Sequence, residues 1–215
     1  MRIDVKRDRP DLYRPGSTDF VEVDVPPTAY LATDGRGDPN TSPAYAAAVA
    51  ALYTVGYAVK FALRARTGDD LVVGPLEGLW SSADHTAYRD RRKGEWDWTM
   101  LLPLPDLVTR EEVEAAREAA AARKAALPVD AVRWFELVEG RSLQIMHIGS
   151  YDDEGPTLAQ LHEEIMPARG LTWNGRHHEI YLGDPRRTAP ERLRTVLRQP
   201  VRPHPGAQMG RPDSR

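Results

Sequence analysis

The feature that most constrains the fold of this chain is an order of elements that occurs twice. The interval from Gly35 to Gly56 has the same length as the interval from Gly149 to Gly170. Each begins where a predicted strand ends, passes through a predicted helix and stops at a glycine, a residue that commonly ends helices. We therefore predict an α+β fold of duplicated strand–helix–strand–strand modules. The pseudo-repeats cover about residues 18–106 and 130–201 of a single domain, 1–201.

Local patterns in the first half predict its individual elements. Phe20–Val25 alternates apolar and polar residues, as a half-buried strand does. Ser42 and Pro43 are typical of a helix start, with serine as the N-cap and proline at the first helical position. We expect this helix to end near Gly56. The alternation across Tyr57–Leu63 then predicts a strand.

Three further segments of this half are expected from their composition. The turn-forming residues from Asp34 to Asn40 predict a turn after the preceding strand. Leu71–Trp80 is expected to form another strand, and the polar residues from Ser81 to Lys93 predict a loop after it.

Later patterns complete the prediction. Apolar residues at every second position from Trp96 to Leu102 indicate a strand with a large aromatic face. Thr109 and Glu112 have the spacing of a capping box and predict a helix after them. Pro156 begins the second-half helix, and His177–Leu182 reads as a strand.

The composition excludes several classes of site. Lys and Arg number 29 against 32 Asp and Glu, a net charge of −3 that argues against a nucleic-acid-binding surface. The absence of cysteine excludes disulfides and thiolate zinc sites. No signal peptide and no run near 18 apolar residues is visible. We expect a cytoplasmic protein without membrane contact, in which the Pro-, Gly- and Arg-rich residues 202–215 form a disordered tail.

Several segments resemble the stand-alone branch of the GyrI-like small-molecule-binding proteins. The most specific are PLEGLW and HHEIYLGDPR, and TDGRGDPNTSPAY and WDWTMLLPLPDLVT support them. The resemblance covers roughly residues 10–201. It implies a curved antiparallel sheet made by the two modules, helices on one side, and a ligand cleft between the halves with Glu179 at its floor.

Members related to this fold include drug-sensing domains of activators, gyrase-protecting proteins and cyclopropanoid cyclopropyl hydrolases, which open the strained ring of duocarmycin-type DNA alkylators. This chain has no helix-turn-helix segment before residue 20, so we do not expect the activator role. The resemblance thus implies binding of a hydrophobic aromatic or cationic small molecule.

Glu179, Tyr151 and Tyr181 are the candidate catalytic residues. A carboxylate amid apolar surface attracts a cation or serves as a general base, although Glu179 could also be a surface residue or an arginine partner. Tyr181 follows it by two positions and so shares its sheet face. The family pattern places a tyrosine near the cleft after Gly149, which here is Tyr151. Either tyrosine could instead belong to the core.

Tryptophans supply the candidate ligand-binding walls. Trp80, Trp96 and Trp98 suit flat or cationic ligands through stacking and cation–π contact, although aromatic residues on strands are often ordinary core. Glu77, near Trp80, and His178, next to the candidate glutamate, complete this set.

We predict no metal and no cofactor. HEEIM, which begins at His162, lacks the second histidine of a zinc-binding HExxH motif. His147 and His162 are interpreted as core or helix-face residues. No phosphate-binding loop or nucleophile elbow is present in the sequence.

Two functions remain open from the sequence. The first is a detoxifying hydrolase that opens an electrophilic cyclopropane with water and so confers drug resistance. The second is a non-catalytic protein that sequesters cationic or planar drugs. A role in shielding gyrase rests on fold analogy alone, and a fold does not determine a function.

Overall fold

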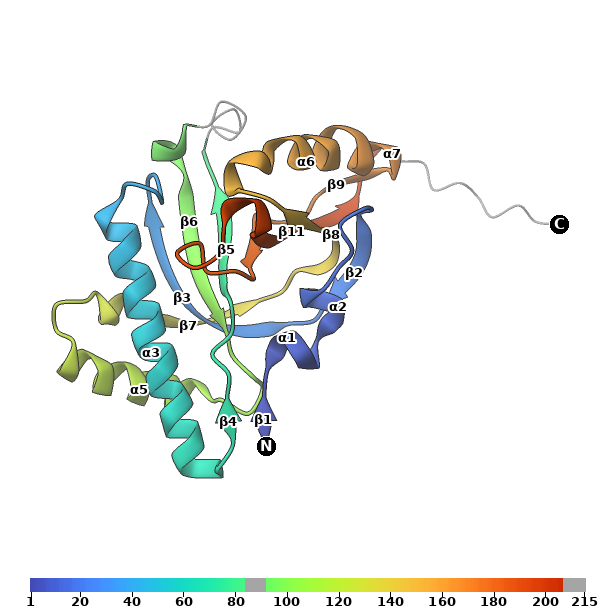
Figure 1. Cartoon of the computed structure of the whole chain (residues 1–215). Helices are drawn as coiled ribbons and strands as arrows, with labels where there is room; N and C mark the ends of the chain where they lie inside the picture. Colours follow the sequence, from blue (N-terminus) through green and yellow to red (C-terminus); the bar gives the residue numbers. More distant parts are fainter. Residues whose placement is uncertain (84–91, 207–215) are drawn as a thin grey trace.

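The computed structural model describes residues 1–83 and 92–206, which form a large antiparallel sheet and a small parallel one (Figure 1). Within these residues the large sheet has the strand order β2-β8-β11-β10-β5-β6-β3-β7, and β9 pairs with β11 outside this path. The strands are β1 (Arg2–Ile3), β2 (Val21–Val25), β3 (Thr28–Arg36), β4 (Asp70–Leu71), β5 (Leu76–Ser81), β6 (Asp97–Pro103), β7 (Arg133–Leu137), β8 (Gly140–Ile148), β9 (Leu171–Trp173), β10 (His177–Tyr181) and β11 (Arg194–Pro203).

The described helices range in length from 3 residues in α7 to 25 residues in α3. The α-helices are α1 (Val5–Asp8), α2 (Pro10–Tyr13), α3 (Pro43–Thr67), α5 (Arg110–Arg123), α6 (Gly155–Ala159) and α7 (Met166–Ala168). A π-helical segment, η4 (Gln160–Ile165), joins α6 to α7. Short 3₁₀ turns occur at η1 (Lys93–Glu95), η2 (Val129–Ala131), η3 (Tyr151–Asp153) and η5 (Pro190–Arg192).

The predicted α+β duplication is confirmed by the sheet order. The first module is β3–α3–β5–β6, and the second is β8–(α6, η4, α7)–β10–β11. β5 and β10 pair in the middle of the sheet and join the modules. The outer strands are exchanged, because β2 of the first half pairs with β8 and β7 of the second half pairs with β3.

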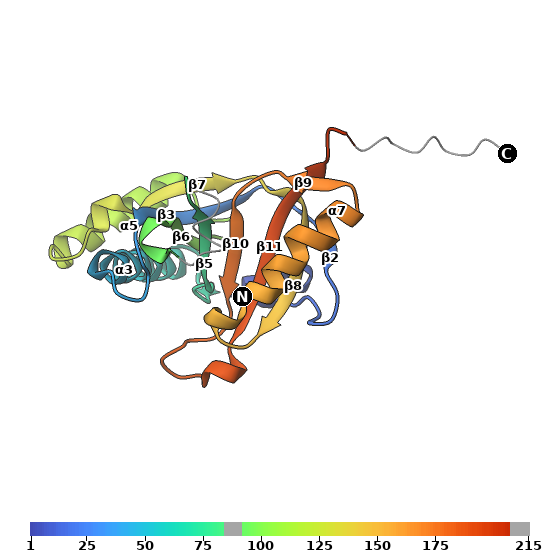
Figure 2. The same ribbon diagram turned by 90° about the horizontal axis from the view of Figure 1, so that it is seen from above.

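The two module helices cover the same face of the sheet, which we call the helix face. Figure 2 shows α3 and α5 at one end of the sheet and α6 to α7 at the other. Leu52 and Val55 of α3 pack with Met100, whereas Leu161 of η4 packs with Leu197. The short helices α1 and α2 lie on the opposite face, which we call the inner face, where Leu12 packs with residues of β10 and β11.

The helix predicted to end near Gly56 continues to Thr67 and ends at Gly68, whose φ is 78°. The strand predicted at Tyr57–Leu63 is therefore wrong. Gly56 serves packing rather than termination, because a Cβ there would lie 3.0 Å from a methyl carbon of Leu102.

The apolar composition of α3 is explained by its position. By length and composition alone, α3 is long and apolar enough to cross a membrane. Its fully buried residues recur at helical spacing and face the sheet, as in a core helix. These residues are Ala51, Leu52, Val55, Val59 and Leu63.

Three boundaries also differ from the prediction. The turn expected from Asp34 begins later, because β3 extends to Arg36. The strand expected over Leu71–Trp80 is divided into β4 and β5. β11 extends to Pro203, so the first residues of the predicted tail are strand, whereas 207–215 lie outside the described residues. The predicted loop at 81–93 includes residues 84–91, which also lie outside them.

A buried cluster of charges lies on the inner face. His178 of β10 has Nε2 2.9 Å from Glu77 and Nδ1 3.0 Å from Glu139. Arg198 of β11 donates to Glu139 over 3.1 Å. All four side chains are at most 3% exposed. Two carboxylates, one guanidinium and a protonated imidazole make the cluster neutral, which buried charges require.

This cluster also holds the N-terminal segment on the sheet. Arg198 donates to the carbonyl oxygen of Leu12 over 2.7 Å, and the Tyr13 hydroxyl donates to Glu77 over 2.9 Å. Gln144 of β8 donates to the carbonyl oxygen of Asp11 over 2.7 Å. Hydrogen bonds thus position α2 together with its apolar contacts.

Glu139→Gln should destabilise the protein by about 3–5 kcal/mol, because the buried cluster would then hold two cations, His178 and Arg198, and only one carboxylate. Urea unfolding followed by circular dichroism would measure the loss. The matched control is Glu22→Gln, which removes the partner of Arg141 at a half-exposed pair and should cost less than about 1 kcal/mol. Equal losses in the two variants would contradict the role of the cluster.

The cluster should also make stability depend on pH. Burial by itself lowers the pKa of His178, but Glu139 and Glu77 outweigh burial and raise this pKa to about 9. The stabilisation is complete below the ordinary pKa of 6.5 and is lost as the pH rises through about 9. The free energy of unfolding should therefore fall between these pH values, and His178→Gln should flatten the fall. Parallel pH curves for the two proteins would be the contrary result.

Candidate functional site

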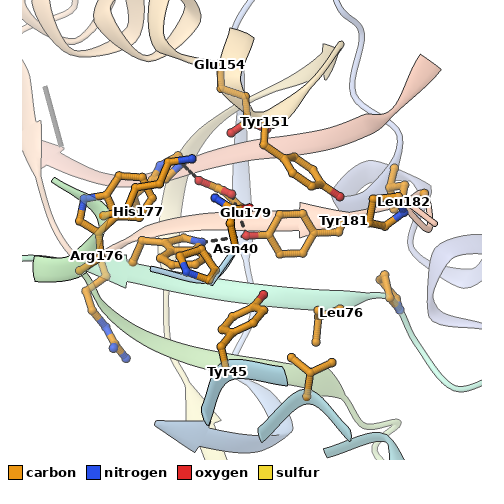
Figure 3. A pocket seen from close by; sticks show the side chains of 18 of the residues that line it. Asn40, Tyr45, Leu76, Tyr151, Glu154, Arg176, His177, Glu179, Tyr181 and Leu182 are labelled. Carbon is orange, nitrogen blue, oxygen red and sulfur yellow. Dashed lines mark hydrogen bonds and ion pairs between the residues drawn. The ribbon is translucent and has the colours of Figure 1, made fainter. Parts of the chain in front are cut away.

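A cleft of about 1830 Å³ lies on the helix face, where the two modules meet (Figure 3). Both halves of the chain contribute to its walls. α3, β5 and the segment after η1 supply one side, and η3, η4 and β10 supply the other. Its polar and aromatic lining includes Tyr45, Tyr53, Trp80, Trp96, Tyr151, Glu154, His162, Trp173, His177, Glu179 and Tyr181.

The pleat of β10 selects which of its side chains reach this cleft. Successive residues of a strand face opposite sides, so His177, Glu179 and Tyr181 share the helix face. Glu179 lies opposite Gly78 of β5. A Cβ at Gly78 would come within 2.8 Å of the Trp80 indole nitrogen and 3.3 Å of the Tyr181 hydroxyl. The glycine thus leaves room for these two groups to meet.

A chain of hydrogen bonds holds the Glu179 carboxylate. The indole N–H of Trp80 donates to the Tyr181 hydroxyl over 2.9 Å, and this hydroxyl donates to Glu179 Oε2 over 2.7 Å. Glu179 Oε1 lies 3.5 Å from Nε2 of His177, and the Glu179 side chain is 14% exposed. The Tyr181 hydroxyl thus accepts a hydrogen bond from Trp80 and donates one to Glu179, and this link fixes the position of the carboxylate.

Three tyrosines surround Glu179 (Figure 3). Burial, and next the charge of Glu179, raise the pKa values of Tyr181 and Tyr45. Burial together with Glu154 and Glu179 raises the pKa of Tyr151 to about 12. All three phenols therefore remain protonated at neutral pH and are able to donate a hydrogen bond.

Aromatic rings form much of the remaining wall. Trp80 and Trp96 meet edge to face with ring centroids 5.6 Å apart, and Tyr151 and Tyr181 meet similarly at 5.4 Å. Such surfaces suit flat or cationic ligands. The structure thus places Glu179, Tyr151, Tyr181, Trp80 and Trp96 at one cleft, as the sequence suggested.

Trp98 was expected to line the cleft but lies beneath it, 2% exposed. It faces Gly35 across the β3–β6 pair, and its indole occupies the space above that glycine, where a Cβ would come within 2.1 Å. Its ring meets Tyr45 edge to face at 5.2 Å. Trp98 therefore supports a cleft residue and does not contact the cleft itself.

Glu77 and His178 do not reach the cleft either, which corrects their assignment as ligand-binding residues. Both project to the inner face and are 0% exposed in the charge cluster. Each is a strand neighbour of a residue on the helix face, Gly78 and Glu179 respectively, so the pleat sends it to the other side.

Residues that the sequence analysis missed lie at the same cleft. Tyr45 comes from the first turn of α3, and His177 could have been found from its period-two relation to Glu179. His162 projects from the π-helical segment, a type of helix distortion that is frequent at functional sites. Among the described residues no group of three or more His, Asp or Glu side chains could hold a metal ion.

His162 is held uncharged. Burial, followed by the neighbouring His177, lowers the pKa of His162 to about 3. Its ring lies 4.1 Å from that of Trp173 and 6.4 Å from that of His177, measured between centroids. His162 therefore adds an uncharged ring to this end of the cleft.

Comparisons with known proteins agree with this architecture. Residues 18–202 match the model of the GyrI-like small molecule binding domain. An uncharacterised conserved protein from Listeria innocua is 36% identical over 93% of this chain and 100% of its own, with a TM-score of 0.84. A hydrolase from the same organism is 34% identical over 93% and 100%, with a TM-score of 0.80. The C-terminal domain of EcmrR, 11% identical over 86% and 98% with a TM-score of 0.56, shares the fold. No curated protein matches the sequence.

Tyr181→Phe should destabilise the protein by about 1–3 kcal/mol, because the indole N–H of Trp80 and the carboxylate of Glu179 each lose a buried partner. Chemical unfolding would measure the change. Tyr57→Phe is the matched control, since Tyr57 is 50% exposed, and should change stability by less than about 0.5 kcal/mol. A Tyr181→Phe protein as stable as the control would show that the chain of hydrogen bonds is unimportant.

Proposed function

This chain belongs to the GyrI-like small molecule binding domain family, and on that premise we propose that it is a hydrolase that opens a strained electrophilic ring with water. The observation that carries the proposal is the Glu179 carboxylate, held by Tyr181 in an aromatic cleft beside further phenol donors. The substrate class is a cyclopropane conjugated to a dienone carbonyl, as in duocarmycin-type DNA alkylators. Similar proteins named hydrolases support the reaction type.

The cleft offers a group for each need of this reaction. Ring opening requires a water positioned at a cyclopropane carbon and a donor at the carbonyl oxygen, which receives the electron pair. Glu179 positions the water and takes its proton, acting as a general base. Tyr151 polarises the carbonyl, since its phenol remains protonated at neutral pH. Tyr181 fixes the direction of the carboxylate.

The aromatic walls supply binding and orientation. A planar heterocycle stacks against Trp80, Trp96 and the tyrosines, and this contact holds the electrophilic carbon near the carboxylate. Ring opening gives a phenol and an alcohol, so the product has lost the alkylating group. The physiological consequence would be detoxification and resistance to such drugs.

The alternative is a non-catalytic binder of cationic or planar aromatic drugs. One specific observation favours it: Glu179 is a carboxylate at only 14% exposure among aromatic rings, an arrangement that attracts a lipophilic cation. In that case Glu179 supplies charge compensation, and the hydroxyl of Tyr151 is dispensable.

Incubation with a duocarmycin-type compound should yield a product heavier by one water, detected by mass spectrometry. Glu179→Gln should lower kcat by roughly 100-fold or more, because the amide does not accept a proton from water. Tyr151→Phe should lower kcat by roughly 10-fold or more, since carbonyl polarisation is lost. Glu164→Gln, which alters an exposed glutamate of η4 that is not part of the cleft lining, should retain activity.

No ring-opened product above the buffer background would reject the hydrolase. A cationic dye such as rhodamine 6G then distinguishes the alternative. Tight binding that is lost in Glu179→Gln and kept in Tyr151→Phe would establish the binder, and weak binding independent of Glu179 would reject both functions.

A further inference from the structure

His177 has no task in the reaction described above, although it lies beside Glu179. Its Nε2 is 3.5 Å from Glu179 Oε1, and its side chain is 7% exposed. Neither ring nitrogen has a hydrogen-bond partner among the described residues. Buried polar atoms are nearly always hydrogen-bonded, so two unpartnered nitrogens on one ring of a cleft wall require an explanation.

The two oxygens of Glu179 are in different environments. Oε2 accepts the hydrogen bond from the Tyr181 hydroxyl at 2.7 Å. Oε1 is the oxygen that faces His177. A proton that Glu179 removes from water therefore belongs on Oε1, since Oε2 is occupied by a donor. The nearest ring nitrogen then lies directly beside the newly protonated oxygen.

The surroundings of His177 suit a transient positive charge. On one side is the Glu179 carboxylate, and on another is His162, whose ring is 6.4 Å away and meets that of His177 edge on. Because burial lowers the pKa of His162 to about 3, this neighbour adds no positive charge at neutral pH. The adjacent His178 projects to the opposite face. The adjacent Arg176 also lines the cleft, and its guanidinium donates to the Thr99 hydroxyl over 2.8 Å. An imidazolium at His177 would thus have the Glu179 carboxylate on one side and an uncharged ring on another.

We propose that His177 takes up the proton that Glu179 removes from the attacking water. This role rests on the proposed hydrolysis. His177 acts through Glu179, so it is a positioning residue that restores the carboxylate. An imidazole is a stronger base than a carboxylate, with ordinary pKa values of about 6.5 and about 4.3, and the restored carboxylate beside it stabilises the imidazolium.

The protons balance over the cycle. The water oxygen bonds to a cyclopropane carbon, the ring C–C bond breaks, and its electron pair moves through the dienone to the carbonyl oxygen. One water proton passes to Glu179 Oε1 and on to His177 Nε2, while the other stays on the new alcohol. The carbonyl oxygen, which accepts a hydrogen bond from Tyr151, becomes the oxygen of a phenolate. The proton held on His177 then passes to this product phenolate through Glu179 or solvent and gives the phenol.

The test compares three variants on a duocarmycin-type substrate. His177→Gln places an amide nitrogen near the position of Nε2 and so keeps a polar N–H group beside Glu179 that cannot accept a proton. His177→Phe keeps the ring volume. Both should lower kcat by roughly 10-fold or more, with KM changed by less than about twofold. In His177→Ala, added imidazole should restore much of the lost kcat, and it should restore none in Glu179→Gln.

Each outcome decides the proposal. Thermal unfolding of each variant identifies those that fold. Full activity of His177→Gln would show that a polar group without a basic nitrogen suffices at this position and would overturn proton uptake. A His177→Ala variant that imidazole does not rescue would overturn it as well. An active wild-type protein with an unaffected His177→Phe variant would remove this role and leave the hydrolase intact. A wild-type protein without activity would remove the proposed function itself and the proton role with it.

Discussion

The structure depends on the pleat of β10 at the seam where the two modules pair. β10 lies between β5 of the first module and β11 of the second module. Its side chains alternate between the two faces of the sheet, so neighbouring residues enter the charge cluster and the cleft. His178 projects into the inner-face charge cluster and Glu179 into the cleft. Adjacent residues of one strand thereby anchor the fold and form the site. A register shift of one residue would exchange them, placing Glu179 among buried acids and His178 in the cleft.

The two sides of this strand hold carboxylates in contrasting ways. Burial alone raises the pKa of Glu139, but His178 and Arg198 outweigh burial and lower it to about 2, which keeps this group ionised and inert. Glu179 has instead a phenol donor on one oxygen and an unpaired imidazole near the other. A carboxylate without a permanent cation remains able to meet a proton or a ligand cation. This difference in partners separates a structural acid from a functional one.

Hydrolysis and cation binding would use the same physical features of the cleft. Both need an acid shielded from bulk water and flat aromatic walls, which Trp80, Trp96 and the tyrosines provide. Catalysis needs two further elements, a donor at the carbonyl and a destination for the proton. Tyr151 and His177 are placed to supply them. The additional polar groups around Glu179 are therefore what favour chemistry over sequestration.

Local patterns in the amino-acid chain were enough to predict the duplicated α+β plan, most strands, the Ser42 and Thr109 helix starts and the shared face of Glu179 and Tyr181. These follow from local periodicity and capping, which neighbouring residues decide. Local patterns did not determine the length of α3, because Gly56 ends a helix or packs against a sheet depending on what lies opposite. Nor did they separate Trp98 from Trp80, since burial beneath α3 depends on contact with Gly35. The placement of His178 and Glu77 away from the ligand was decided only by tertiary structure, which sets which face of a strand is cleft and which is core.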